Sequence, residues 1–85
     1  MLYLIYKQEE MPDNRKYNKI RVVLADRERT IKWLAGQLDK KPNTVSRWCR
    51  NEMQPSIETF YKIAEILRVE ICELFNPLNK IDEEF

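Results

Sequence analysis

The sequence predicts a single all-α domain that is built from five short helices. The chain has 85 residues, which is enough for one modest hydrophobic core. Apolar residues make up 44% of the chain and charged residues 34%, with one glycine and four prolines, a balance typical of a compact soluble helical protein. Along most of the chain, apolar residues recur every three or four positions, which is the spacing that places them on one face of a helix.

The first two helices are predicted at residues 18–28 and 31–38. In the first, Ile20, Val23 and Leu24 fall at the helical spacing, with basic residues between them. Thr30 is a good N-cap for the second, because a threonine side chain can accept a hydrogen bond from a free N–H group of the first turn. The apolar stripe of the second helix consists of Ile31, Leu34, Ala35 and Leu38.

The third helix is predicted at residues 42–50, after a break at residues 39–41. Pro42 suits the first turn of a helix, where its missing N–H would have had no partner. The inward-facing residues of this helix are Val45, Trp48 and Cys49, and we expect Trp48 to belong to the core.

A fourth helix is predicted to begin after Ser56, which is placed to cap it, and to end at Leu67. Its apolar face consists of Ile57, Phe60, Ile63, Ala64 and Leu67. A short fifth helix is predicted at residues 70–75. Residues 76–77 end it, because Pro77 disfavours helical geometry at the residue before it.

The junction of the second and third helices is the most informative feature. Two short helices that meet through a three-residue break form a helix-turn-helix. The helices need a small side chain where they approach each other, and Ala35 provides one. The turn needs a residue that tolerates the left-handed conformation, a role we assign to Asp39 at some cost relative to glycine.

The charge is unevenly distributed, although the net charge is only +1. Residues 15–50 contain eleven lysines and arginines against three acidic residues, whereas residues 51–85 contain three against eight. A nucleic-acid-binding protein needs a basic face rather than a basic total. The first half of the domain is therefore the predicted polyanion-facing side.

The composition argues against an enzyme and against a metal site or cofactor. The chain has no histidine, which removes the usual general base, and one glycine cannot build a phosphate-binding loop. Cys49 and Cys72 lack the spacing of a zinc site, so we expect both to be free thiols. The apolar start of the chain is too short for a signal peptide or a membrane span, and we expect a cytoplasmic protein.

Five blocks of residues resemble the Cro and phage-repressor-like helix-turn-helix proteins of the XRE family. The blocks are T-x-x-x-L-A-x-x-L at residues 30–38, N-T-V-S-R-W at 43–48, Q-P-S-I-E-T at 54–59, K-I-A-E-I-L at 62–67 and E-L-F at 73–75. The resemblance implies a five-helix, lambda-repressor-like DNA-binding domain. The chain departs from the family pattern at the turn and next to Trp48, where it has Asp39, Lys40, Lys41 and Cys49.

The resemblance also implies how such a protein would meet DNA. The third helix would lie in the major groove of double-stranded DNA, with Asn43, Thr44 and Arg47 at the base edges. The chemistry of these side chains fits, because asparagine can bind adenine, arginine can bind guanine O6 and N7, and a threonine methyl can meet a thymine methyl. The candidates for phosphate contact are Lys32, Lys40, Lys41, Arg50 and Asn51.

The resemblance does not cover the ends of the chain. We divide the sequence into an N-terminal arm at residues 1–17, the helix-turn-helix domain at 18–76 and an acidic tail at 77–85. For the arm, an edge strand that pairs with a second chain, an arm on the core and a disordered segment remain open.

The expected function is regulation of transcription by sequence-specific binding to double-stranded DNA, as a homodimeric repressor on a palindromic operator. The alternative is a protein-interaction module on the same scaffold, such as an antitoxin-like protein that holds a protein partner. The basic first half favours DNA, whereas the apolar residues of the N-terminal arm favour a protein partner.

Overall fold

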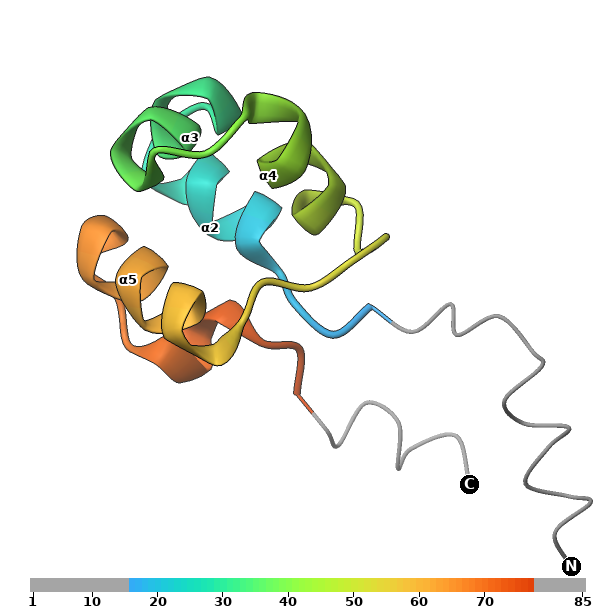
Figure 1. The fold of residues 1–85 in the computed structure, drawn as a ribbon. Coiled ribbons are helices and arrows are strands. Elements are labelled where there is room, and N and C mark those ends of the chain that lie inside the picture. Colours follow the sequence, from blue (N-terminus) through green and yellow to red (C-terminus); the bar gives the residue numbers. More distant parts are fainter. Residues whose placement is uncertain (1–15, 78–85) are drawn as a thin grey trace, which may run out of the picture.

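The computed structural model describes residues 16–77 of the chain, and these residues form an all-α domain (Figure 1). The order of elements is α2 (Ile20–Asp26), α3 (Ile31–Leu38), α4 (Pro42–Cys49), α5 (Ile57–Leu67) and a 3₁₀ helix, η1 (Ile71–Leu74). Within residues 16–77 the β-type pairing is limited to one isolated antiparallel bridge, between Asn18 and Phe75. The predicted all-helical class is thus confirmed, while the predicted N-terminal arm and acidic tail lie largely outside the described residues.

Two of the predicted helices differ from the structure. The first begins at Ile20 rather than at residue 18, because Asn18 is paired with Phe75 at the other end of the domain. The short fifth helix predicted at residues 70–75 is present as the four-residue 3₁₀ helix η1 rather than as a further α-helix. It lies between Arg68 in the left-handed conformation and Phe75 in an extended one, which leaves too few residues for two α-helical turns.

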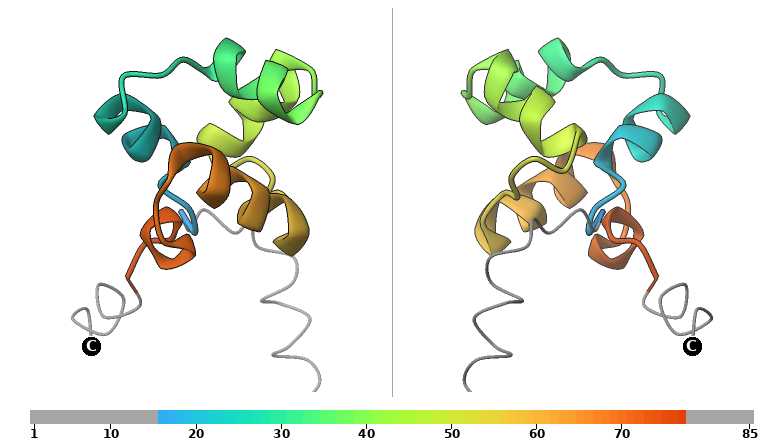
Figure 2. Two further views of the ribbon diagram at one scale, coloured as in Figure 1. Left: turned by 90° about the vertical axis from the view of Figure 1, so that its left-hand side faces the viewer. Right: turned by 90° about the vertical axis from the view of Figure 1, so that its right-hand side faces the viewer.

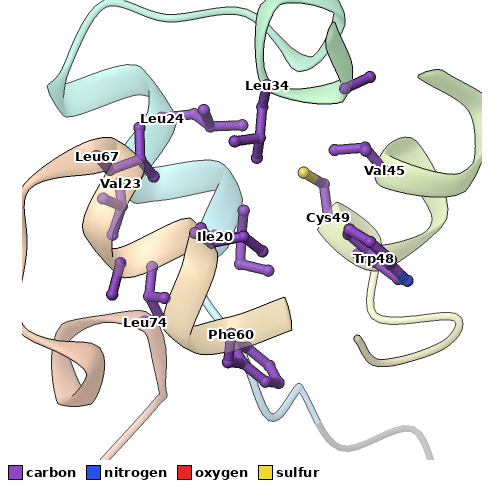
Figure 3. Packing of buried hydrophobic residues seen from close by; sticks show 13 residues of the cluster. Ile20, Val23, Leu24, Leu34, Val45, Trp48, Cys49, Phe60, Leu67 and Leu74 are labelled. Atoms are coloured by element: carbon purple, nitrogen blue, oxygen red, sulfur yellow. The ribbon is translucent and has the colours of Figure 1, made fainter. Parts of the chain in front are cut away.

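One hydrophobic core unites all the elements (Figure 3). Leu34 of α3, Val45 of α4 and Ile63 of α5 have no exposed surface. Trp48 is 5% exposed, which confirms the prediction that it belongs to the core. Phe60 of α5 packs against Phe75 at the end of η1, with 4.6 Å between the ring centroids. This contact holds η1 against α5.

The α3–α4 pair lies at one end of the domain and η1 at the other, with α2 and α5 between them (Figures 1 and 2). The lysines and arginines of α3, of α4 and of the link between them therefore lie at one end of the domain, away from η1, which contains Glu73. None of the helices in residues 16–77 is long and apolar enough to cross a lipid bilayer.

Each α-helix is followed, one or two residues after its last residue, by a residue in the left-handed conformation, and none of these residues is glycine. They are Glu28, Asp39, Asn51 and Arg68, with φ between 57° and 60°. After α3, the N–H of Lys40 donates to the carbonyl of Ala35 and the N–H of Asp39 donates to that of Gly36, the pattern of a Schellman motif. The left-handed conformation predicted for Asp39 is therefore confirmed, with φ 57° and ψ 45°.

Replacing Asp39 with glycine is expected to stabilise the domain by about 0.5–1 kcal/mol, because glycine adopts a positive φ without the steric cost that aspartate bears. Chemical denaturation would measure the change in the free energy of unfolding. Gln37→Gly is the matched control, since Gln37 is an exposed residue inside the same helix, where glycine should cost about 1 kcal/mol. A lower stability of Asp39→Gly would contradict the prediction and assign a stabilising contact to the aspartate side chain.

Asn18 is the one buried polar residue among residues 16–77, at 2% exposure. Its Nδ2 donates to the carbonyl oxygen of Trp48 at 3.1 Å and to Oε1 of Gln54 at 2.6 Å. Its Oδ1 accepts from the N–H of Ile20 at 3.1 Å. This side chain therefore ties the start of α2 to the end of α4 and to the loop that follows α4.

Candidate nucleic-acid interface

Helix α4 presents a polar stripe to solvent and an apolar stripe to the core. Asn43, Arg47 and Arg50 are exposed and fall at positions i, i+4 and i+7, so they lie along one face. Val45, Trp48 and Cys49 lie on the opposite face, and all three are buried. The packing of the apolar stripe fixes the direction in which the polar stripe points.

The helix begins without the help of a capping side chain. Lys41 occupies the N-cap position in an extended conformation, and its side chain makes no capping hydrogen bond. Pro42 follows at the first position, where the fixed φ of proline favours the helical start. The first-turn N–H groups of α4 therefore receive no partner from the side chain of Lys41, although the N–H of Thr44 donates to the backbone carbonyl of Lys41 at 3.0 Å.

The predicted base-reading residues lie in the first turn of α4, which contains Asn43 and Thr44, and in its last turn, which contains Arg47. Asn43 and Arg47 are exposed on neighbouring turns of the same face. Thr44 is half-buried beside them, so its methyl and hydroxyl groups are only partly accessible. The structure brings these three residues together on one short helix.

The lysines predicted to contact phosphate are exposed near the starts of α3 and α4. Lys40 and Lys41 form the link between the two helices, and Lys32 is the second residue of α3. Helix α3 is capped by Thr30, whose Oγ1 accepts from the N–H of Trp33 at 3.0 Å. Positive side chains and two helix N-termini thus lie in the same part of the domain, an arrangement that attracts anions.

Arg47 and Arg50 share one acidic partner, Glu52. Nε and Nη2 of Arg50 donate to Oε2 and Oε1 of Glu52 at 2.8 Å and 3.3 Å, and Nε of Arg47 lies 3.5 Å from Oε1. Arg50 also donates from Nη1 to Oγ of Ser46 at 2.7 Å. The hydrogen bond with Arg50 lowers the pKa of Glu52, and the same hydrogen bond raises the pKa of Arg50.

Asn51 was predicted as a phosphate contact, but its side chain bonds within the protein. Its Oδ1 accepts from the backbone N–H of Asn18 and from Nε2 of Gln54, both at 3.0 Å. Its Nδ2 donates to the carbonyl oxygen of Asn18, also at 3.0 Å. The half-buried Asn51 therefore holds the loop after α4 in place.

Glu52, Arg21 and Ser46 belong to this surface, although sequence reasoning did not select them. Arg21 of α2 lines a half-open hollow of about 190 Å³ together with Ile31, Ser46, Cys49 and Arg50. No sequence signal placed α2 beside the end of α4. For Glu52 the sequence signal was the preceding Asn51. Asparagine can take the left-handed conformation that ends a helix, and the residue after it then lies next to the last turn of that helix.

The free thiol of Cys49 lies at the inner side of this hollow. Burial raises the pKa of the thiol, and this effect outweighs the opposing influence of the guanidinium groups of Arg21 and Arg50. The sulfur atom points toward the core in Figure 3. Cys49 is therefore an uncharged core residue rather than part of the polar stripe.

Comparison with known proteins agrees with the arrangement of the helices. A family model described as helix-turn-helix matches residues 21–74. The chain is similar to a protein from Bacteroides fragilis whose crystal structure is described as that of a candidate DNA-binding protein, with 51% sequence identity and a TM-score of 0.69. The match covers 69% of this chain and 95% of that one. No curated protein matches the chain.

The family match spans every element from α2 to η1, and thus includes the two short helices joined at Asp39 and the exposed stripe of α4. The B. fragilis protein shares both sequence and fold over most of this length. The chain therefore belongs to the XRE family of helix-turn-helix proteins, the family of Cro and the phage repressors.

Proposed function

We propose that the chain is a sequence-specific double-stranded DNA-binding protein that regulates transcription as a repressor. In this proposal α3 and α4 are the helix-turn-helix unit, and α4 enters the major groove. The observation that carries the proposal is the exposed stripe of Asn43, Arg47 and Arg50 on a helix whose opposite face is fixed in the core. The description of the B. fragilis protein as DNA-binding supports it.

The roles of the residues follow from their place on α4. Arg47 reads a guanine through O6 and N7, and Asn43 reads an adenine, since each side chain can make two hydrogen bonds to its base. Thr44 adds an apolar contact with a thymine methyl. These three residues give the sequence preference.

Basic residues around the stripe hold the sugar-phosphate backbone and set the register without reading bases. Those assigned to this role are Lys32, Lys40 and Lys41, and Arg21 joins them because it lines the hollow beside the end of α4. Arg50, predicted for the same role, is not assigned to it, because its Nε and Nη2 donate to Glu52 and its Nη1 donates to Ser46. Asn51 supports the surface from behind, because its side chain is bonded to Asn18 and Gln54.

The protein acts as a homodimer in this proposal, because one copy of α4 is too short to specify a site. A helix of eight residues is about 12 Å long, which matches about four base pairs. Two copies on an inverted repeat, with their reading helices about 34 Å apart, read twice as many. We expect the two-fold contact to form either through the fifth helix with Leu78 and Ile81 or through residues 2–6. Of these, η1 is described, whereas Leu78, Ile81 and residues 2–6 lie outside the described residues.

An exposed apolar pair on α5 favours the second candidate function, a protein-interaction module of the antitoxin type. Ile57 is 62% exposed and Tyr61 is 58% exposed, and they lie one turn apart on the same face. This pair has no role in the DNA-binding proposal. If the chain failed to bind duplex DNA, this second candidate function would be favoured, with a protein partner bound at the surface of Ile57 and Tyr61.

The test is the binding of the full chain to a random-sequence duplex at several salt concentrations. Because phosphate contacts release counterions, we expect the affinity to fall steeply with salt. Lys41→Ala should weaken binding to all sequences alike and reduce the slope of log affinity against log salt by about one. Lys62→Ala is the matched control, because Lys62 is an exposed lysine on α5, and it should leave the slope unchanged. Duplex binding that is absent at low salt would overturn the proposal.

A further inference from the structure

Glu52 places a negative charge in the middle of the surface proposed to meet DNA. Its carboxylate contacts the guanidinium groups of both arginines of the polar stripe, Arg47 and Arg50. About half of each of the Arg47 and Glu52 side chains is exposed, at 49% and 48%. An acid at such a place opposes binding to a polyanion, so its position needs an explanation beyond the general charge of the surface.

The backbone fixes Glu52 next to the two arginines. After α4, the N–H of Glu52 donates to the carbonyl of Arg47 at 3.0 Å, and the N–H of Asn51 donates to that of Trp48 at 2.9 Å. These two bonds form a Schellman motif around the left-handed Asn51, whose φ is 60°. Since the side chain of Asn51 is itself bonded to buried Asn18, the carboxylate projects from a fixed turn.

Stability of α4 does not account for this placement. A negative charge near the C-terminus of a helix interacts unfavourably with the helix dipole. Exposed ion pairs contribute little to the stability of a protein, because water and salt screen them. The contact of Glu52 with Arg47 and Arg50 is therefore better explained by an effect on how these arginines bind DNA.

The atoms used in the contacts distinguish the two arginines. Glu52 occupies both Nε and Nη2 of Arg50, which are donors that would otherwise be free for phosphate. Toward Arg47 it faces Nε, and the two terminal nitrogens stay at the tip of the side chain. Those terminal nitrogens can make the paired contact with guanine O6 and N7.

We propose that Glu52 is a specificity-determining residue: its carboxylate holds Arg47 in position for guanine and opposes the binding of both arginines to phosphates. This inference rests on the proposed function. On duplex DNA without the preferred guanine, the arginines have phosphates as their partners, and the carboxylate competes with and repels those phosphates. On the preferred site, Arg47 bonds to an uncharged base edge and keeps its contact with Glu52. Glu52 thus lowers non-specific affinity more than specific affinity.

The experiment compares the full chain and its Glu52→Gln variant on two probes. The first probe is the duplex that the wild-type chain enriches from a random pool, and the second is a scrambled duplex of equal length and composition. We expect Glu52→Gln to bind the scrambled duplex about three- to tenfold more tightly, with a salt slope steeper by about one as the arginines gain phosphate contact. On the enriched duplex the affinity should change by less than about twofold, so the ratio of the two affinities falls.

Two controls separate the proposal from a general effect of charge. Glu65→Gln makes the same charge change on an exposed position of α5, and we expect it to leave the affinity ratio unchanged. In an Arg47→Ala background, Glu52→Gln should no longer alter the affinity for the enriched duplex relative to its single-base variants. Equal melting temperatures of wild type and Glu52→Gln would exclude a loss of folding.

The outcomes distinguish the two proposals. If the wild-type chain binds a preferred duplex, but Glu52→Gln changes both affinities by the same factor or leaves both unchanged, the role of Glu52 is overturned and DNA binding stands. The same holds if Glu65→Gln changes the affinity ratio as much as Glu52→Gln does. If the wild-type chain binds no duplex, both proposals fall.

Discussion

Replacing Asn18 with alanine is expected to lower the free energy of unfolding by about 2–3 kcal/mol, because the change leaves buried polar groups without partners. The N–H of Ile20 loses its acceptor and Oε1 of Gln54 loses a donor, while the carbonyl of Trp48 keeps only the N–H of Asn51. For a domain of this size, such a change corresponds to a fall in melting temperature of about 10 °C or more. Thermal and chemical denaturation would measure it.

Two further variants make this prediction specific. Asn18→Asp keeps the acceptor for Ile20 but turns an oxygen toward the carbonyl of Trp48, so we expect it to be at least as destabilising as Asn18→Ala. Asn43→Ala removes an exposed asparagine from α4 and should change stability by less than about 0.5 kcal/mol. If Asn18→Ala destabilised the domain no more than Asn43→Ala, the buried network would have no net role in folding.

Arg47→Ala is expected to weaken binding to the preferred duplex by about 1–3 kcal/mol and to relax the preference at one base pair of each half-site, because it removes a two-point contact with guanine. Binding to the enriched duplex and to its single-base variants would measure both effects. The side chain of Arg47 is exposed and forms its ion pair with the exposed Glu52, so the domain should keep its melting temperature.

Lys41→Ala is the matched comparison, since Lys41 is an exposed cation at the N-cap position of α4 with no base to read. Its loss should weaken the enriched duplex and all variants by a similar factor. If Arg47→Ala also weakened binding to the enriched duplex and to all its variants by a similar factor, Arg47 would be a phosphate contact and its assignment to guanine would be wrong.

The central helices could be predicted because their signals are local. Thr30, Pro42 and Ser56 mark the starts of α3, α4 and α5, and each acts within three residues of the helix that it begins. Helical spacing of apolar residues then assigned Val45 and Trp48 to the core, and so left Asn43 and Arg47 for the outer face.

The ends of the domain could not be predicted in the same way. The start of α2 and the form of η1 depend on the pairing of Asn18 with Phe75, which are far apart in the sequence. The N–H of Lys19 also donates to the carbonyl of Leu74 at 2.8 Å. No local pattern reports such contacts, so the sequence predicted a fifth helix over residues 70–75 but not its shorter 3₁₀ form.

The candidate site was predicted in its first half and missed in its second. Exposed positions of α4 follow from helical spacing, whereas the loop after α4 follows from the left-handed Asn51. That conformation is more common for glycine, and the chain has no glycine at any of the four helix ends in residues 16–77. The inward turn of the Asn51 side chain and the contact of Glu52 with Arg47 and Arg50 are consequences of this turn.

Methylation interference on the enriched duplex tests most directly whether α4 reads the major groove. Methylation of guanine N7 places a methyl group in the major groove, whereas methylation of adenine N3 places one in the minor groove. We predict that N7 methylation of one guanine in each of two half-sites, about one helical turn apart, blocks binding of the wild-type chain. Arg47→Ala should bind the methylated and the unmethylated duplex equally well. Interference confined to adenine N3, or the same guanine pattern for wild type and Arg47→Ala, would contradict the assignment of α4 as the reading helix.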